Sequence, residues 1–223
     1  MAADVSGLSF EATDAQRPRL RGMLHAAAFA VSCLVGALFV AYTPAHAFAV
    51  VVFAASASLM LGTSALYHRI TWSPSRRLWM RRADHAAIFL LIAGTYTPVA
   101  LIGLHGAWRT SVLAIVWTGA AAATITKLCW VRSPKWLSAA IGLALGWVAV
   151  AAVPQLAHNE GLAPLFLLAA GGIAYTAGAV VYACRRPDPL PRVFGYHELF
   201  HALTILALSC QYVAIAVFIV HVT

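Results

Sequence analysis

The chain has 223 residues, of which 62% are hydrophobic and only 10% charged, and its formal net charge is +8. Soluble domains carry about a quarter charged residues, so this composition excludes a soluble globular domain and indicates a membrane protein with several spans. The positive charge does not indicate nucleic-acid binding, because the basic residues lie in short loops between apolar runs and form no face interleaved with aromatic residues.

Seven apolar runs are long enough to cross a membrane as helices: 24–43, 46–69, 85–104, 110–130, 135–153, 161–183 and 197–221. At about 1.5 Å per residue, each spans a hydrocarbon core of about 30 Å. The polar residues 1–17 are expected to form a short tail without a cleavable signal peptide. Because the connections are short, residues 18–223 are expected to form one domain, an all-α bundle of seven transmembrane helices with antiparallel neighbours.

Loop and helix signals refine these elements. Ser73-Pro74 predicts a helix start, followed by a basic interfacial turn that leads straight into the third run. The proline-rich stretch 185–191 predicts a loop, and Pro98 predicts a kink in the third helix, with the freed backbone groups satisfied by Thr95 or Thr97. Gly142 and Gly146 form a small-xxx-small pair, which predicts a helix contact.

The loops that alternate along the chain differ sharply in positive charge. One side has 14 of the 15 Lys and Arg residues, and Arg109 alone lies opposite. Basic residues favour the cytoplasmic side of a membrane protein, so the N-terminus is expected in the cytoplasm and the C-terminus outside. The basic loops are expected to face anionic lipid headgroups.

Polar residues gather at the expected cytoplasmic ends of three runs. Ser64 and His68 lie one helical turn apart at the end of the second run, and Asp84 opens the third. His197 and His201 open the seventh within an H-E-x-x-H string, which puts both imidazoles on one helix face. Three histidines and a carboxylate at one depth predict a catalytic zinc site with an open position.

Each of these residues also has a structural interpretation. His68 alone suits a position beside lipid headgroups, Ser64 can bond to its own backbone, and Asp84 can pair with Arg81 or Arg82 or cap the third helix. Among the other histidines, two lie near this end of the bundle and four near the opposite surface. His85 points about 100° away from Asp84 around the helix, and His25 is expected at the membrane interface. The four near the opposite surface are His46, His105, His158 and His221.

The order Ser64-x-x-x-His68, Asp84, Ile92-Ala93-Gly94-Thr95-Tyr96-Thr97-Pro98 and His197-x-x-x-His201 resembles the hemolysin III family. That family is the bacterial branch of the progestin and adipoQ receptor (PAQR) proteins, which are related to alkaline ceramidases. The resemblance implies seven helices in a bacterial inner membrane and zinc held by His68, His197 and His201, with Ser64 and Asp84 in the polar shell around the metal. Gln211 departs from the pattern, because relatives often have another histidine there.

Two functions fit this pattern best. The first is a zinc-dependent hydrolase of a lipid amide or ester, in which Asp84 handles the proton of the attacking water and Ser64 supports the oxyanion. The second is a non-catalytic membrane sensor with structural zinc. A cytolysin is disfavoured by the topology of a resident membrane protein. An intramembrane metalloprotease would use Glu198 as its base, but its typical L-D-G string is absent, and Glu198 equally suits the first turn of a helix.

Overall fold

The computed structural model describes residues 18–130 and 133–220. Within these ranges the chain is helical, apart from short connections and one isolated bridge between Leu190 and Phe194. The predicted tail 1–17, Arg132 and His221 lie outside the described residues.

Seven helical segments are long and apolar enough to span a membrane, which confirms the predicted number. The spans begin with α1 (Met23–Tyr42), α2 (Ala47–Arg69, preceded by the short η2, Pro44–His46), α3 (Pro74–Gly103) and α4 (Gly106–Cys129). The fifth span comprises α5 (Lys135–Gly146), η3 (Val148–Ala152) and α6 (Val153–Glu160), and α7 (Ala163–Cys184) is the sixth. The seventh consists of α8 (Tyr196–Val213) and the π-helical η4 (Ala214–Ile219).

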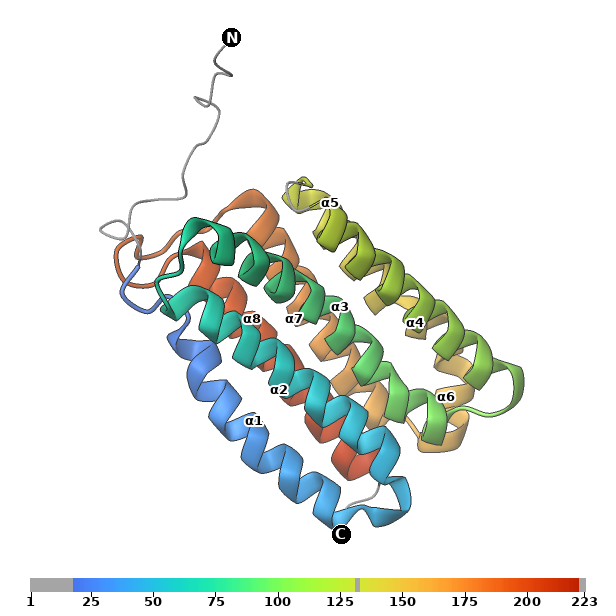
Figure 1. Ribbon diagram of the computed structural model, residues 1–223. Coiled ribbons are helices and arrows are strands. Elements are labelled where there is room, and N and C mark those ends of the chain that lie inside the picture. Colours follow the sequence, from blue (N-terminus) through green and yellow to red (C-terminus); the bar gives the residue numbers. More distant parts are fainter. Residues whose placement is uncertain (1–17, 131–132, 221–223) are drawn as a thin grey trace.

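Consecutive helices pack against each other along much of the bundle (Figure 1). α1 packs on α2, α2 on α3 and α3 on α4, while α7 packs on α8, and α8 returns to contact α1. α2 and α3 are the most buried spans. The outer helices instead expose large apolar side chains, such as Leu34 (64% exposed) and Phe166 (71%), as expected of surfaces that face lipid.

Two spans differ from their predicted bounds by more than four residues. α3 begins at Pro74, which confirms the helix start predicted from Ser73-Pro74, and the basic turn continues without a break into the apolar run; Ser73 precedes the helix without a side-chain cap bond. The fifth span extends to Glu160 but is broken after Gly146, where the Tyr96 hydroxyl donates to the Gly146 carbonyl at 2.7 Å and accepts from the Ala149 amide at 2.8 Å. These two bonds replace helical bonds that the interruption removes.

Two finer predictions about membrane-spanning residues turn out differently. Pro98 lies inside α3, but Thr95 donates to the Leu91 carbonyl and Thr97 to the Ala93 carbonyl. The freed group is the carbonyl of Gly94, because Pro98 has no N–H to donate to it. Neither threonine bonds that carbonyl. Gly142 and Gly146 do not mediate a tight helix contact, because a methyl group on Gly146 would meet nothing within 4 Å and one on Gly142 only Ile92 at 3.8 Å. Both glycines line a cavity instead.

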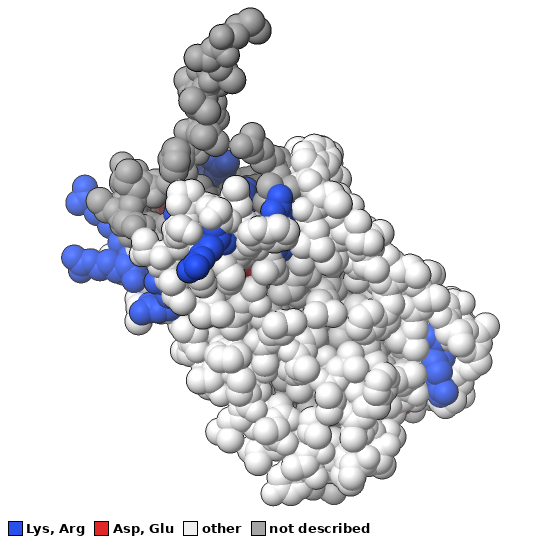
Figure 2. Space-filling view, viewed as in Figure 1, with Lys and Arg blue, Asp and Glu red and all other residues white. Residues whose placement is uncertain are grey.

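Lys and Arg side chains gather over one end of the molecule, with one further basic spot at the other end (Figure 2). The crowded end is the one at which α2 ends and α1, α3 and α8 begin, so its basic residues come from segments far apart in the sequence. The described ones near these helix ends are Arg19, Arg21, Arg69, Arg76, Arg77, Arg81, Arg82, Lys127, Arg185, Arg186 and Arg192. Polar residues of the candidate site come from the same helix ends.

Candidate metal centre

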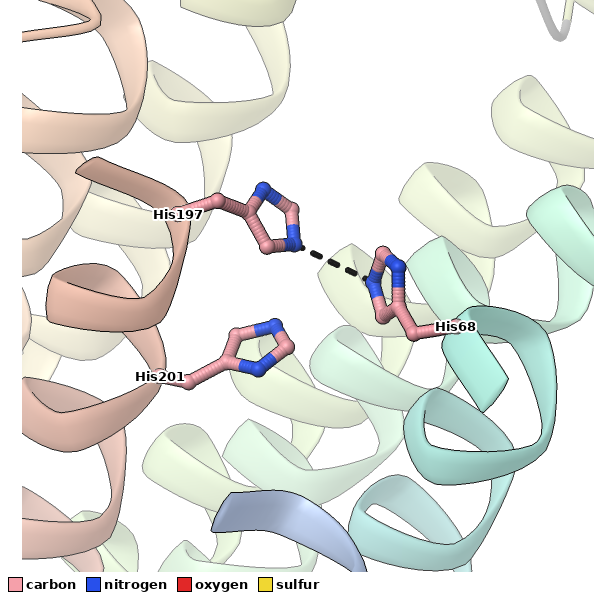
Figure 3. A group of neighbouring side chains, drawn as sticks. All are labelled: His68, His197 and His201. Atoms are coloured by element: carbon pink, nitrogen blue, oxygen red, sulfur yellow. Dashed lines mark hydrogen bonds between the residues drawn. The ribbon is translucent and has the colours of Figure 1, made fainter. Parts of the chain in front are cut away.

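Three histidines from two helices meet at this end of the bundle (Figure 3). His68 is in the last turn of α2, and His197 and His201 are in the first two turns of α8. The Nε2 atoms of His68 and His197 are 3.1 Å apart, and one ligand atom from each of the three rings lies within 4.8 Å of the others. The structure therefore brings together the three histidines that the sequence predicted.

This arrangement fits a metal ion. Zinc binds histidine nitrogen at about 2.0–2.1 Å with tetrahedral angles, which places two ligand nitrogens about 3.3 Å apart, close to the observed 3.1 Å. Nδ1 of His201 is buried and has no hydrogen-bond partner among the described residues. Among those residues, this is the single group of three or more histidine, cysteine or acidic side chains with metal-binding geometry.

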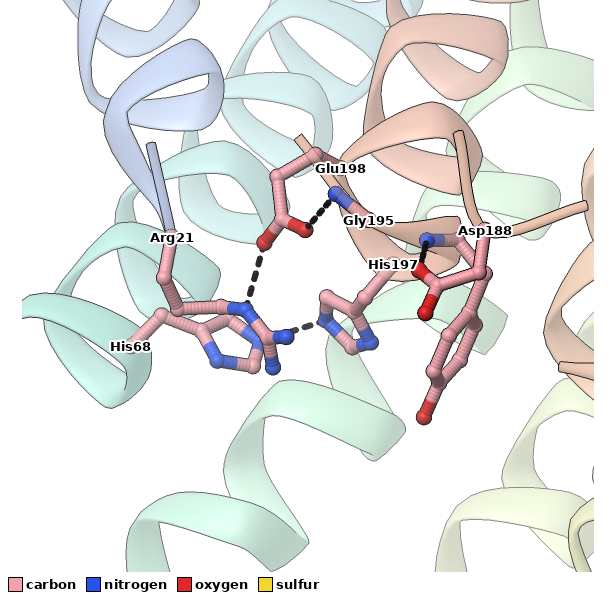
Figure 4. Close-up of polar contacts among 7 residues, drawn as sticks. Arg21, His68, Asp188, Gly195, His197 and Glu198 are labelled. Carbon is pink, nitrogen blue, oxygen red and sulfur yellow. Dashed lines mark hydrogen bonds and ion pairs between the residues drawn. The ribbon is translucent and has the colours of Figure 1, made fainter. Parts of the chain in front are cut away.

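The start of α8 is fixed by polar contacts that orient its histidines (Figure 4). Glu198 accepts a hydrogen bond from the Gly195 amide at 2.9 Å, which caps the helix, and its other oxygen pairs with Nε of Arg21 at 2.5 Å. Asp188 accepts a hydrogen bond from the Tyr196 amide at 2.8 Å. Glu198 is only 1% exposed and both its oxygens are engaged, so its contacts are those of a helix-capping acid.

The segment before α1 is held over the same helix start. The Arg19 amide donates to the Arg192 carbonyl at 3.0 Å, and the Leu20 amide donates to the Val193 carbonyl at 3.1 Å. Gly22 has a φ of 75°, and a Cβ there would lie 2.7 Å from Cβ of His68, so this turn needs glycine for both backbone and space. We name residues 18–22 the N-terminal strap.

His25 is a fourth histidine at the site, and its side chain is buried among the helices. Its side chain is 2% exposed, and its ring is stacked on His201 with centroids 3.7 Å apart and planes 8° from parallel. His25 lies within the first turn of α1, at the same end as the other three. The sequence places His25 at the same depth in the bundle as the other three histidines. Its ring contact with His201, however, depends on how α1 packs against α8.

A cavity of about 1130 Å³ extends from the three histidines into the bundle. Ser64 and Asp84 are buried and line it, as does His85. The wall has basic side chains as well, namely Arg21, Arg77, Arg81 and Arg185. Further along the spans, the lining is mainly apolar: Met60, Ile88, Leu91, Ile92, Val99, Leu143, Val150, Val153, Leu156, Leu165, Phe166 and Leu168. The cavity thus has a polar end beside the histidines and an apolar interior.

Comparison with known proteins identifies the family. Residues 13–212 match the family model described as "Haemolysin-III related". The chain belongs to the hemolysin III family. A Bacillus subtilis (strain 168) protein named "Hemolysin-3 homolog" is 32% identical over 154 residues, which cover 69% of each chain. "Hemolysin-3" of Bacillus cereus is 38% identical over 131 residues, which cover 59% of each chain, less than two thirds of that relative.

This hemolysin III chain has Gln211 where the resemblance predicts a histidine. Gln211 lies on α8 ten residues after His201, or about 15 Å along the helix axis. It lines the same cavity, and its Oε1 is buried without a hydrogen-bond partner among the described residues. Its place in the wall therefore puts it well away from the three-histidine group.

Proposed function

We propose that this hemolysin III protein is a zinc-dependent hydrolase that cleaves an amide or ester bond of a membrane lipid. The observation that supports it best is the three-histidine group at the polar end of a cavity that is apolar along most of its length. A lipid has the same division into a polar head and an apolar chain. The motif resemblance to PAQR proteins and alkaline ceramidases supports the same chemistry by analogy.

The ligand set favours zinc among the common metals. Three imidazoles suit zinc, copper, iron and nickel, and zinc is the one of these without redox chemistry to suppress. A bound Zn²⁺ supplies a Lewis acid that polarises a carbonyl and makes water more acidic. His68, His197 and His201 would hold the ion, with His197 and His201 oriented by the capped start of α8.

Two buried residues of the cavity wall have roles in the proposed hydrolysis. The Asp84 carboxylate takes a proton from the water that attacks the carbonyl carbon, and it returns that proton to the departing amine or alcohol. The Ser64 hydroxyl donates a hydrogen bond to the carbonyl oxygen as negative charge develops there. Both side chains line the cavity that the histidines line.

We further propose that the site faces the cytoplasmic leaflet of a bacterial inner membrane. The support is the excess of Lys and Arg at the histidine end, which the positive-inside rule associates with the cytoplasm. A lipid would enter sideways with its head near the basic start of α3, where Arg76, Arg77, Arg81 and Arg82 are located. Such a surface suits an anionic or zwitterionic headgroup.

Metal analysis and a lipid comparison test this function. Purified protein should contain about one zinc per chain, and His197→Ala and His201→Ala should each lose most of it. Asp84→Asn should keep the metal and lose hydrolysis of lipid extracts, measured by mass spectrometry of released products. Full zinc occupancy in the His197→Ala/His201→Ala double variant would refute the assignment of the site.

A second candidate is a non-catalytic protein in which the metal joins helices. The observation that favours it is that the histidines come from α2 and α8, and the bonded pair His68 and His197 is 129 positions apart in sequence. A metal there would tie the second span to the seventh. In that case zinc removal would lower the unfolding temperature, and Asp84→Asn protein and wild type would leave lipid extracts equally unchanged.

A further inference from the structure

Deeper in the cavity, two polar side chains have no part in the proposed hydrolysis. Tyr175 of α7 and Gln211 of α8 both line the cavity. The Tyr175 hydroxyl and the Gln211 Oε1 atom are buried, and neither has a hydrogen-bond partner among the described residues. Buried polar atoms in folded proteins are nearly always paired, so each of these needs a partner that the described residues do not supply.

The two groups lie on neighbouring parts of the α7–α8 wall. A Cβ on Gly171 would lie 3.3 Å from Cγ of Gln211, so Gln211 packs directly against α7 there. Tyr175 is one helical turn further along α7 than Gly171, on the same face. The two polar groups therefore belong to one region of the wall.

This region is separate from the metal centre. At the histidine end of α7, the Tyr182 ring lies 5.9 Å from the His197 ring. Tyr175 precedes Tyr182 by two turns, which places it about 10 Å deeper along the helix. Much of the surrounding lining is apolar, including Leu165 and Leu168. An apolar chain that reaches this depth would meet two unpaired polar atoms, whereas a chain with a matching polar group would satisfy them.

We propose that Tyr175 and Gln211 form a second polar subsite that binds a hydroxyl group carried part-way along the hydrocarbon chain of a lipid. The Tyr175 O–H donates to the ligand oxygen, and the ligand O–H donates to Oε1 of Gln211. A hydroxyl satisfies both at once, because it donates and accepts, whereas a carbonyl would leave Oε1 of Gln211 unpaired. The inference rests on the proposed function for the position of the lipid head, and it deepens that function by naming the lipid class.

Paired fatty acids test the subsite without any hydrolysis. The two ligands are stearate and a hydroxystearate with a mid-chain hydroxyl, which contain no amide or ester bond to cleave. Their dissociation constants are measured on the detergent-purified full chain. Two additional hydrogen bonds predict that wild type binds the hydroxylated acid about five- to tenfold more tightly. Tyr175→Phe and Gln211→Leu should each remove most of that preference without weakening the binding of stearate, which has no group that bonds either side chain.

Tyr212→Phe is the matched control. It makes the same chemical change in the residue next to Gln211, but the Tyr212 ring packs against Phe53 at 4.5 Å between centroids and does not line the cavity. This variant should retain the full preference. The test variants should fold, because each replaces an unpaired buried polar group by an apolar one, which does not lower the stability of the ligand-free protein.

The same measurement on His197→Ala/His201→Ala protein separates this inference from the proposed function. A hydroxyl preference that persists there supports the subsite even if zinc or hydrolysis is disproved. Equal binding of the two fatty acids by wild type would overturn the subsite. So would a preference that both Tyr175→Phe and Gln211→Leu retain, since water or another group would then be the partner of the hydroxyl.

Discussion

At the scale of single residues, His25 lies outside the group of three candidate ligands but is stacked on one of them, His201. Its ring lies flat against His201, so it limits the orientations that His201 can adopt. Residues that orient a metal ligand typically change metal affinity by about 10–100-fold when they are removed. His25→Ala should therefore bind zinc about tenfold more weakly, as measured by competition with a chelator of known affinity.

His25→Phe is the control for this prediction, because it keeps a flat ring in the stack but has no nitrogen. If ring packing is the cause, His25→Phe should retain most of the affinity. Equal loss in both variants would instead assign the effect to the imidazole nitrogens of His25.

Glu198 provides the second prediction at this scale. Glu198→Gln keeps an oxygen for the Gly195 amide but loses the ion pair with Arg21. The Arg21 side chain is 22% exposed and can be partly hydrated after the change, so the loss of stability should be moderate, about 1–3 kcal/mol. Thermal unfolding in detergent measures it.

Zinc content and any hydrolysis of the folded Glu198→Gln protein should stay near the wild-type level. A double-mutant cycle with Arg21→Met measures the interaction energy of the Arg21–Glu198 pair. Once Glu198→Gln has been made, Arg21→Met should lower stability little further. A Glu198→Gln protein that is stable, binds zinc and has no activity would contradict the capping role and favour a catalytic one.

At the scale of elements, the contact between α2 and α3 depends on Gly94. A Cβ on Gly94 would overlap the Ser56 side chain, with 2.7 Å to its Cβ. In membranes, such close approach of small residues supplies much of the attraction between helices. Gly94→Ala should lower stability by about 1–3 kcal/mol because the helices must separate.

Gly146→Ala is the control for this prediction, since nothing lies within 4 Å of the added methyl group. Ser56→Gly combined with Gly94→Ala should restore most of the lost stability, because it removes the nearest obstructing atoms. Equal unfolding temperatures for Gly94→Ala and wild type would show that α2 and α3 do not pack as described.

The elements also show which features a sequence can predict. The number of spans can be counted from the sequence, because the thickness of a membrane sets the minimum length of an apolar run that crosses it as a helix. The break after Gly146 was not predictable, since it is stabilised by the hydroxyl of Tyr96 from another helix. The start of α3 at Pro74 was predictable from Ser73-Pro74, but the apolar run itself begins only near residue 85, because the first turns of the helix are basic.

The candidate metal centre also has some features that could be predicted from the sequence and others that could not. His68, His197 and His201 could be predicted because helical spacing and span direction place them at one depth. The stacking of His25 on His201 could not be predicted, because it depends on how α1 packs against α8. For Glu198, the sequence left a catalytic base and a first-turn acid as alternatives, and the contact with Arg21, 177 positions away, favours the second.

At the scale of the whole molecule, the uneven distribution of Lys and Arg predicts which membrane face is next to the metal centre. We expect a membrane-permeant chelator to remove zinc from the protein in intact cells and an impermeant one to leave it in place. Zinc retained after purification measures the outcome. In inverted membrane vesicles, which expose the cytoplasmic face, both chelators should remove the metal.

Equal removal by the two reagents in sealed cells would place the centre at the outer surface. That result would overturn the expected topology and the expected inner-leaflet substrate together. The assignment of the three-histidine group as a candidate metal site would still stand, because the distances between its nitrogens do not depend on the side of the membrane that the group faces.

The N-terminal strap has a consequence for biogenesis. Arg21 precedes the first span, while its partner Glu198 and two of the three candidate metal ligands are in the last. During synthesis from the N-terminus, the first six spans are made before these partners. A metal bound by all three histidines would therefore require α8 to be in place, and a chain that ends before α8 has Arg21 without Glu198 and one of the three candidate ligands, His68. Such an unfinished chain therefore differs from the mature protein both in its charge pairing and in its candidate metal ligands.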